Sequence, residues 1–316
     1  MRRHKIISIL LILVVISSIL FVIYGLNPNS YQYALSRRIP KLIAIAITGS
    51  GVAVSSVIFQ TVTNNRILTP SVLGLDSLYT LMQTLIVFTL GSFNVALIGS
   101  NSNFILSGLL MIGFSLVLFK MMFRQENTNL FFLLMLGMIF GTLFSSLSSF
   151  MQMVMDPNEF LIVQNKMFAS FNNIESSLLG ISLVTIGITL VWVLKDVKKL
   201  DVLSLGKEQA INLGLDYDRL IRKMLIAVSI LVSVSTALVG PITFLGILVT
   251  NLAYQVVKNH RHSIVIPTAI LISLLALIGG QFLVERIFQF NTTIGVIINF
   301  IGGLYFIYIL LKEERL

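Results

Sequence analysis

The chain contains no cysteine and very few charged residues. None of its 316 residues is a cysteine, and Asp, Glu, Lys and Arg together make up only 11% of it. The missing thiols exclude disulfide bonds, thiolate metal sites and cysteine nucleophiles. Soluble domains carry roughly 25% charged residues, so this chain has too few charges to cover the surface of a soluble fold. We therefore expect an integral membrane protein.

Long apolar runs occupy most of the sequence, which is 56% hydrophobic with a mean hydropathy of +0.95. About 20 apolar residues in a helix cross a hydrocarbon core of roughly 30 Å. The alternating segments of about ten residues that a β-barrel would need are missing. We predict an all-α membrane protein, with about ten transmembrane helices in one bundle that forms a single domain over residues 1–316. The predicted spans are about 6–24, 42–63, 77–98, 103–123, 129–153, 176–194, 224–240, 242–257, 263–284 and 294–311.

The first apolar run follows the basic pentapeptide MRRHK, as in a secretory signal peptide. However, the run is nearly long enough to span a membrane, and no small-residue cleavage site closes it. We therefore predict a retained helix.

The chain is basic, with 22 Lys and Arg against 13 Asp and Glu. Cytoplasmic loops of membrane proteins are enriched in Lys and Arg. If both termini are cytoplasmic, only five basic residues fall outside, namely Arg37, Arg38, Lys41, Lys166 and Arg286. This distribution explains the charge without a nucleic-acid partner, and it predicts that both termini lie in the cytoplasm.

The most polar internal segment is LSLGKEQAINLGLDYDRLIRK, residues 203–223. We predict two short cytoplasmic helices at about 203–222, with Ser204 capping the first and Asp216 capping the second. Gly214 suits the left-handed residue that ends the first helix. The second helix is expected to run into the following span.

Residues suited to catalysis or metal binding are scarce. The stretch DVLSLGKE lacks the first glycine and the hydroxyl residue of a phosphate-binding loop. The segment NHRH, 259–262, is interpreted as a solvated loop, because histidines two apart do not share a helix face. We therefore predict no catalytic residue, no metal site and no cofactor. A secondary transporter or a membrane enzyme stays open as an alternative, since backbone carbonyls can bind sodium.

Five motifs, in the same order, make the chain resemble the permeases of ABC importers for iron-siderophores and vitamin B12. They are RRIPK (37–41), Gln60 with TNNRILTPSVLG (63–74), LSLGKEQAINLGLDYDR (203–219), VGPITFLGILVTNLAYQVVKNHRHSIVIP (239–267) and NTTIGVIINFIGGLYFIYILLK (291–312). The chain departs from the family pattern at Thr250 and Asn251, where a Pro-His pair is usual. The segment TNNRILTPSVLGLDSLY is most similar to the branch that handles ferric catecholate siderophores such as petrobactin.

The resemblance implies a permease subunit of a bacterial cell membrane importer, powered by separate ABC ATPase subunits. It implies that the polar segment docks on the ATPase, and the residues expected to couple the two subunits are Gly206, Glu208, Ala210, Leu213 and Gly214. It also implies a second permease chain, identical or similar, and an extracytoplasmic siderophore-binding protein that docks on Arg38, Lys41 and Arg286. The expected substrate is a ferric siderophore, with heme and cobalamin left open.

Overall fold

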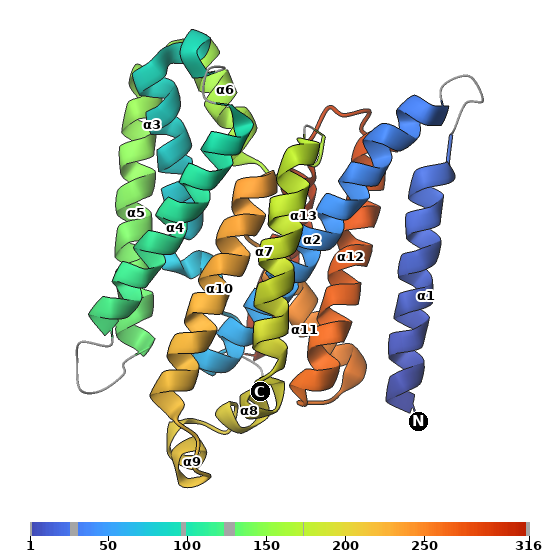
Figure 1. Cartoon of the computed structure of the whole chain (residues 1–316), viewed down its shortest axis with the longest axis vertical. Coiled ribbons are helices and arrows are strands. Elements are labelled where there is room, and N and C mark those ends of the chain that lie inside the picture. The colour runs from blue at the N-terminus through green and yellow to red at the C-terminus, as the bar shows by residue number, and fades with distance from the viewer. Residues whose placement is uncertain (1, 26–30, 96–98, 123–129, 173, 314–316) are drawn as a thin grey trace.

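The computed structural model describes residues 2–25, 31–95, 99–122, 130–172 and 174–313. Within these ranges every regular element is a helix (Figure 1), as predicted. The helices are α1 (Arg2–Ile23), α2 (Tyr31–Thr63), η1 (Pro70–Leu73), α3 (Leu75–Val95), α4 (Ser100–Met122), α5 (Leu130–Val154), α6 (Pro157–Met167), α7 (Ser176–Leu194), α8 (Val197–Leu203), α9 (Lys207–Asn212), α10 (Tyr217–Val239), α11 (Leu245–Val257), α12 (His262–Arg286) and α13 (Ile294–Glu313).

Each of the ten predicted spans overlaps one helix. Seven helices in the described part of the chain are long and apolar enough to cross a membrane. The other three predicted spans fall on α3, α11 and α13, whose apolar stretches are the shorter Leu75–Gly91, Leu245–Val257 and Ile294–Ile309. The helix positions are therefore confirmed, whereas the number of crossings stays a prediction.

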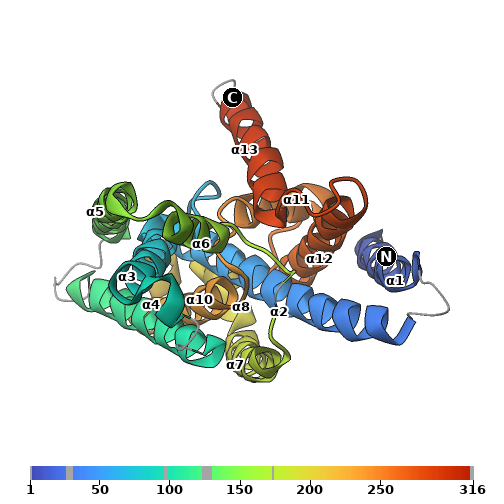
Figure 2. The ribbon, with the colours of Figure 1, turned by 90° about the horizontal axis from the view of Figure 1, so that it is seen from above.

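Helices α2 and α10 form the centre of the bundle. Both are largely buried, and α2 packs against α7, α10, α11 and α12 (Figure 2). Small residues on α2 permit this close packing, which in membranes depends on van der Waals contact. A Cβ added at Gly51 would lie 2.5 Å from the Ser235 hydroxyl of α10. The small-residue run of α2 therefore positions the core.

The connection between α2 and α3 turns back into the bundle. Asn64 adopts a left-handed φ of 48°, and η1 follows at mid-height of the molecule (Figure 1). Gly74, with φ 75°, ends η1 and rests against Gly137 and Gly141 of α5. These two glycines are four residues apart, a spacing that lets backbones approach closely in membranes. The connection is therefore exposed at residues 64–66 and largely buried from η1 onward.

One local prediction for the outer segments needs correction, and another is confirmed. From its sequence the stretch MDPNEF (155–160) predicts a plain turn, but it begins a helix instead, because the Asp156 side chain accepts a hydrogen bond from the Asn158 amide and caps α6. Pro157 occupies the first helical position, where its missing N–H costs nothing. The segment 163–177, which is polar enough to predict a partly helical stretch at the outer surface, is helical at the end of α6 and at the first two residues of α7, as predicted.

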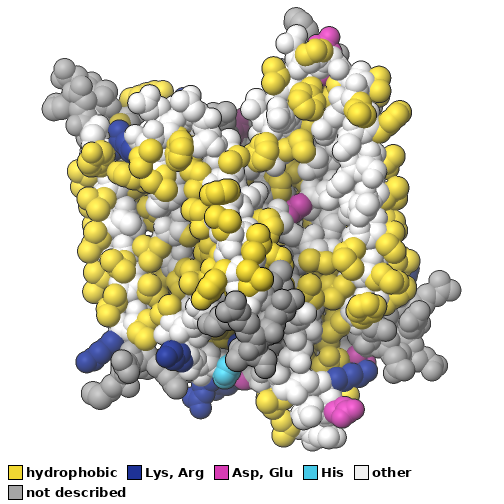
Figure 3. Space-filling model, turned by 180° about the vertical axis from the view of Figure 1, so that it is seen from behind, with side chains coloured by type: hydrophobic (Ala, Val, Ile, Leu, Met, Phe, Trp, Pro, Cys, Tyr) yellow, Lys and Arg dark blue, Asp and Glu magenta, His cyan; other side chains and the backbone are white. Residues whose placement is uncertain are grey.

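Helix α1 lies at the edge of the bundle, against α12 and the beginning of α2 (Figures 1 and 2). The beginning of α1 and the end of α13 both lie toward the end of the molecule that carries α8 and α9 (Figure 1). A broad hydrophobic surface covers the middle of the face seen in Figure 3, and Lys and Arg gather mostly below it.

Candidate functional site

The polar segment of the sequence forms the tip of one end of the molecule. Helices α8 and α9 are joined through Gly206, whose φ of 97° requires glycine. Gly214, with φ 80°, follows the end of α9, and the Leu215 amide donates back to the Ala210 carbonyl. Asp216 then caps α10, which continues without a break into the bundle. The predicted helical pair exists, with tight glycine turns on both sides of α9.

One predicted cap is wrong. Ser204 does not begin a helix but ends α8, and its hydroxyl donates to the Asp201 carbonyl. Gly206 stands at the N-cap of α9 instead, and it offers no side chain to cap it. The sequence favoured Ser204 because serine is a preferred N-cap residue, but the extra turn of α8 was not recognised.

The surface of α9 combines exposed apolar side chains with one acidic side chain. Leu205, Ile211 and Leu213 are 56%, 50% and 65% exposed, and Glu208 is exposed beside them. Ala210, in contrast, is fully buried within the chain, so it supports α9 rather than facing outward. Three large apolar side chains are thus exposed on a polar tip, on or next to α9.

Asp196 attaches α8 to the body of the bundle. Its carboxylate pairs with Lys199 of α8 at 2.7 Å and with Lys223 of α10. Lys223 also lies over the Trp192 ring of α7, 4.9 Å from its centroid. Burial acts to raise the pKa of Asp196, but hydrogen bonds and charge from the two lysines hold it below its ordinary value. The carboxylate therefore stays ionised at neutral pH and ties three helices together.

A second attachment joins α8 to α12 and α2 through His262. Asp201 of α8 accepts from both the backbone amide and Nδ1 of His262, each at 2.7 Å. The other ring nitrogen, Nε2, lies 2.7 Å from the Thr61 hydroxyl of α2. The interpretation of NHRH as a solvated loop was therefore wrong for His262, which is 1% exposed. No group of three potential metal-ligating side chains occurs among the described residues.

This Asp–His–hydroxyl row does not resemble a working nucleophile. The Thr61 hydroxyl also lies 2.8 Å from the Val57 carbonyl of its own helix, and the imidazole is buried. The row therefore fixes α8 against two spans, so that a force on α8 reaches both. Neither Asp196 nor Asp201 was predicted from the sequence, because single carboxylates on a polar segment carry no pattern.

At the opposite end, the three predicted docking residues mostly contact their own chain. Arg38 donates to the carbonyls of Val22 and Tyr24 at 2.6 and 2.9 Å, and Arg286 donates to Tyr24 at 2.7 Å. Both guanidinium groups thus hold the end of α1, although Arg286 stays exposed.

Lys41, the third docking candidate, forms a 2.6 Å ion pair with Glu285, and the two side chains are only 12% and 9% exposed. This pair joins α2 to α12. The structure therefore assigns all three basic residues a bonding partner within the chain and leaves Arg286 the most accessible.

A cavity of about 560 Å³ opens near this end, between α4, α6 and the end of α10. Its polar lining includes Lys166, Asn103 and Glu175. Lys166 donates to the Gln83 side chain at 3.0 Å, and burial lowers its pKa. The volume lies within the range of about 300–1,000 Å³ that is typical of small-molecule sites.

The helix arrangement is that of a polytopic membrane protein with the fold of an ABC transporter permease subunit. The fold matches a solved chain described as an inward-facing conformation of a transporter assigned to the metal-chelate ABC type, with a TM-score of 0.85 and 22% identity, over 98% of this chain and 99% of that one. The model of the FecCD transport family matches residues 5–312, and the chain belongs to that family.

Two curated relatives are similar over the whole chain. The Petrobactin import system permease protein YclO of Bacillus subtilis is 57% identical over 315 residues, 100% of this chain and 99% of the relative. The Petrobactin import system permease protein FatC of Bacillus anthracis is 35% identical over 100% of this chain and 90% of its own length. The family resemblance predicted from the five motifs is therefore confirmed, and the chain is a multi-pass protein of the cell membrane.

Proposed function

We propose that this chain is the permease subunit of an ABC importer that carries a ferric siderophore of the petrobactin type across the bacterial cell membrane. The observation that carries the proposal is the 57% identity to a petrobactin permease over nearly the full length of both chains. The single permease domain spans residues 1–316, and ATP is hydrolysed on a separate subunit.

The proposed coupling element is α9 with its two glycine turns. Its exposed Leu213 and Glu208 offer an apolar and a charged contact to an ATPase groove, while Gly206, Ala210 and Gly214 set its shape. The ties from α8 to α2, α10 and α12 support this role, because they connect the tip to several spans. Closure of the ATPase then moves these spans together.

We propose that all ten helices at the predicted spans cross the membrane and that both termini are cytoplasmic. The gathering of Lys and Arg toward the α8–α9 end supports this orientation (Figure 3). The shorter α3 and α11 each follow a segment that is not α-helical, namely 67–74 and 240–244, and both segments are largely buried in the protein. Irregular backbone is tolerated at membrane depth when protein surrounds it.

A second permease chain is proposed to pack beside this one. Helix α13 projects away from the bundle (Figure 2), and Phe300, Leu304 and Tyr308 on it are more than half exposed. At the outer end, an acidic surface of a siderophore-binding protein is proposed to dock near Arg38, Lys41 and Arg286. Because Lys41 is paired inside the chain, Arg286 is expected to contribute most.

The decisive experiment is reconstitution in proteoliposomes with the cognate ATPase and binding protein. We would measure ATP-dependent uptake of radiolabelled iron as ferric petrobactin, with ferric hydroxamate, heme and cobalamin as competitors. Uptake that requires ATP and is reduced only by catecholates supports the proposal. Iron uptake without the ATPase would instead establish a secondary transporter, and inhibition by heme or cobalamin would change the substrate.

A further inference from the structure

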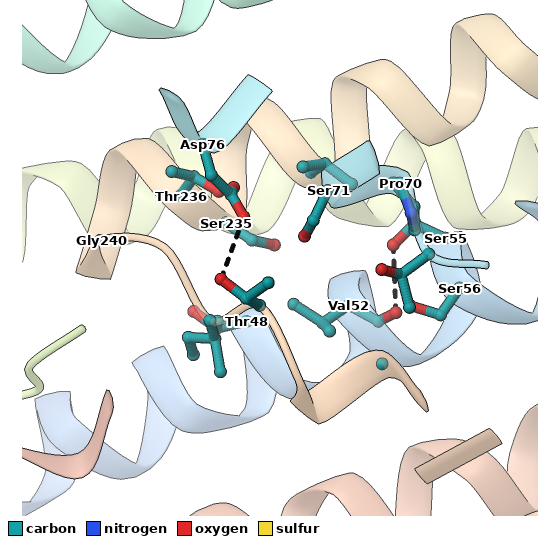
Figure 4. A pocket seen from close by; sticks show the side chains of 15 residues that line it. Thr48, Val52, Ser55, Ser56, Pro70, Ser71, Asp76, Ser235, Thr236 and Gly240 are labelled. Carbon is teal, nitrogen blue, oxygen red and sulfur yellow. Dashed lines mark hydrogen bonds between the residues drawn. The ribbon is translucent and has the colours of Figure 1, made fainter. Parts of the chain in front are cut away.

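A partly exposed carboxylate lies where two runs of helix are interrupted, between η1 and α3 and between α10 and α11. Asp76 stands in the first turn of α3, directly after η1. Across a small cavity lies the end of α10, where Gly240 adopts a φ of 96°. Figure 4 shows Asp76, Ser71, Ser235 and Thr48 around this space. Three segments that are distant in the sequence thus meet around one acidic group.

Among the residues that the structure describes, no basic side chain lines this cavity. The Asp76 carboxylate is hydrogen-bonded by the side chains of Ser71 and Thr243, the latter at 3.4 Å. An ionised group at the depth of a bilayer costs several kcal/mol on most scales and persists where a partner or a function compensates it. Hydroxyl groups solvate a carboxylate but do not balance its charge. The site therefore calls for a positive ion or a proton.

Two buried hydroxyl groups at the same cavity lack any hydrogen-bond partner among the described residues. They are Thr48 Oγ1 of α2 and Ser235 Oγ of α10, and the two side chains are 0% and 2% exposed. A buried hydroxyl left without a partner costs about 1–3 kcal/mol. Since both occur beside the unbalanced carboxylate, one bound species that accepts oxygen ligands accounts for all three groups.

One of the surrounding helix ends, the C-terminal end of α10, also suits a cation, while the N-terminal ends of α3 and α11, which carry partial positive charge, face the same cavity. The C-terminal end of α10 faces the cavity, and the C-terminal end of a helix carries partial negative charge. Broken helices in other membrane transporters use such ends, together with free carbonyls, to coordinate sodium. Oxygen is the preferred ligand of hard cations, and the polar groups named here offer only oxygen.

We propose that Asp76, Thr48, Ser235 and Thr243 bind one sodium ion within the membrane. A monovalent ion balances the single carboxylate, whereas a divalent ion would leave a net positive charge in an apolar region. The cavity leaves about 20 Å³ to a water-sized sphere, which is room for one small ion without its hydration shell. Bound sodium joins α2, α3 and α10, so the occupied site stabilises one packing of the central helices.

The test uses the full-length chain purified into lipid nanodiscs, without ATPase or substrate. Thermal unfolding is compared in sodium, potassium and choline chloride at equal ionic strength, and binding of radioactive sodium is measured directly. We expect saturable sodium binding and an unfolding temperature about 2–4 °C higher in sodium than in the other two salts. Asp76→Asn removes both effects.

Thr48→Val and Ser235→Ala keep the test valid if Asp76→Asn fails to fold. Each removes a hydroxyl that is unpartnered without the ion, so neither lowers stability in choline, but each weakens sodium binding about tenfold or more. Thr189→Val is the matched control, because its hydroxyl bonds its own helix at Thr185 and does not line the cavity. Thr189→Val should bind sodium and show the higher unfolding temperature in sodium, as the unsubstituted chain does.

The sodium site would be ruled out by equal unfolding temperatures in sodium and choline, or by a sodium effect that survives in Asp76→Asn. A proton on Asp76 would then neutralise its charge. If potassium raises the unfolding temperature as much as sodium does, the site does not select the smaller ion, and the argument from the cavity volume is wrong. Neither result bears on iron uptake, so this proposal and the proposed function fail separately.

Discussion

At the scale of single residues, the ion pair between Lys41 and Glu285 shows how a basic outer residue serves the fold. The ammonium group lies 2.6 Å from the carboxylate, and it also lies over the Phe290 ring, 5.3 Å from the centroid. Glu285 accepts a further hydrogen bond from Gln281 at 2.9 Å. With both partners mostly buried, removing one leaves the other as an uncompensated charge.

Lys41→Met is therefore expected to destabilise the chain by about 2–4 kcal/mol, measured by thermal unfolding in nanodiscs. The double variant Lys41→Met with Glu285→Leu should recover most of this loss, since an apolar pair can replace a buried ion pair. If Lys41→Met unfolds like the wild type but binds the siderophore-binding protein more weakly, Lys41 acts in docking and the ion pair is incidental.

Residue roles were the part that sequence reasoning predicted least well. The basic positions 38, 41 and 286 were identified, but their partners were not, because Glu285 and the carbonyls of α1 lie far from them in sequence. His262 was placed in a loop because its spacing from His260 suggested nothing more. Its partners Asp201 and Thr61 come from two other helices, and a contact of that kind leaves no local pattern.

At the scale of elements, the contact of η1 on α5 depends on glycine. A Cβ added at Gly137 would lie 2.7 Å from the Val72 carbonyl oxygen and 2.8 Å from the Leu73 Cα, both backbone atoms. Backbone cannot rotate away as a flexible side chain can, so α5 or η1 must shift. The glycine pair therefore fixes how deeply the broken connection enters the bundle.

Gly137→Ala should lower the free energy of unfolding by about 1–3 kcal/mol, the usual cost of overpacking. Gly187→Ala, on α7, is the control, since its added Cβ meets no atom within 4 Å and alanine favours a helix by about 1 kcal/mol. Thermal unfolding of both variants measures whether the contact between η1 and α5 requires glycine at position 137. If the two variants are equally stable, α5 and η1 shift apart to accept the added methyl group without loss of stability.

At the scale of the whole molecule, the sequence predicted the helices well and the breaks in them poorly. Apolar runs identified ten of the helices, because burial in lipid demands hydrophobic stretches. The depth of η1 could not be predicted from turn chemistry, since Asn64, Asn65 and Pro70 would also suit a surface loop. That depth follows from packing on α5, which depends on residues about 65 positions later in the sequence.

The coupling proposal predicts a variant that is folded but inactive. Leu213 is 65% exposed at the tip of the molecule, so Leu213→Asp should leave expression and unfolding temperature unchanged. It should abolish ATP-dependent uptake and the stimulation of ATP hydrolysis by the permease, because a charge would be buried in an apolar contact. Ile287→Asp, equally exposed at the opposite end, is the matched control and should keep that stimulation. Normal stimulation in Leu213→Asp would show that α9 transmits no force, and the ties of Asp196 and Asp201 would then serve stability alone.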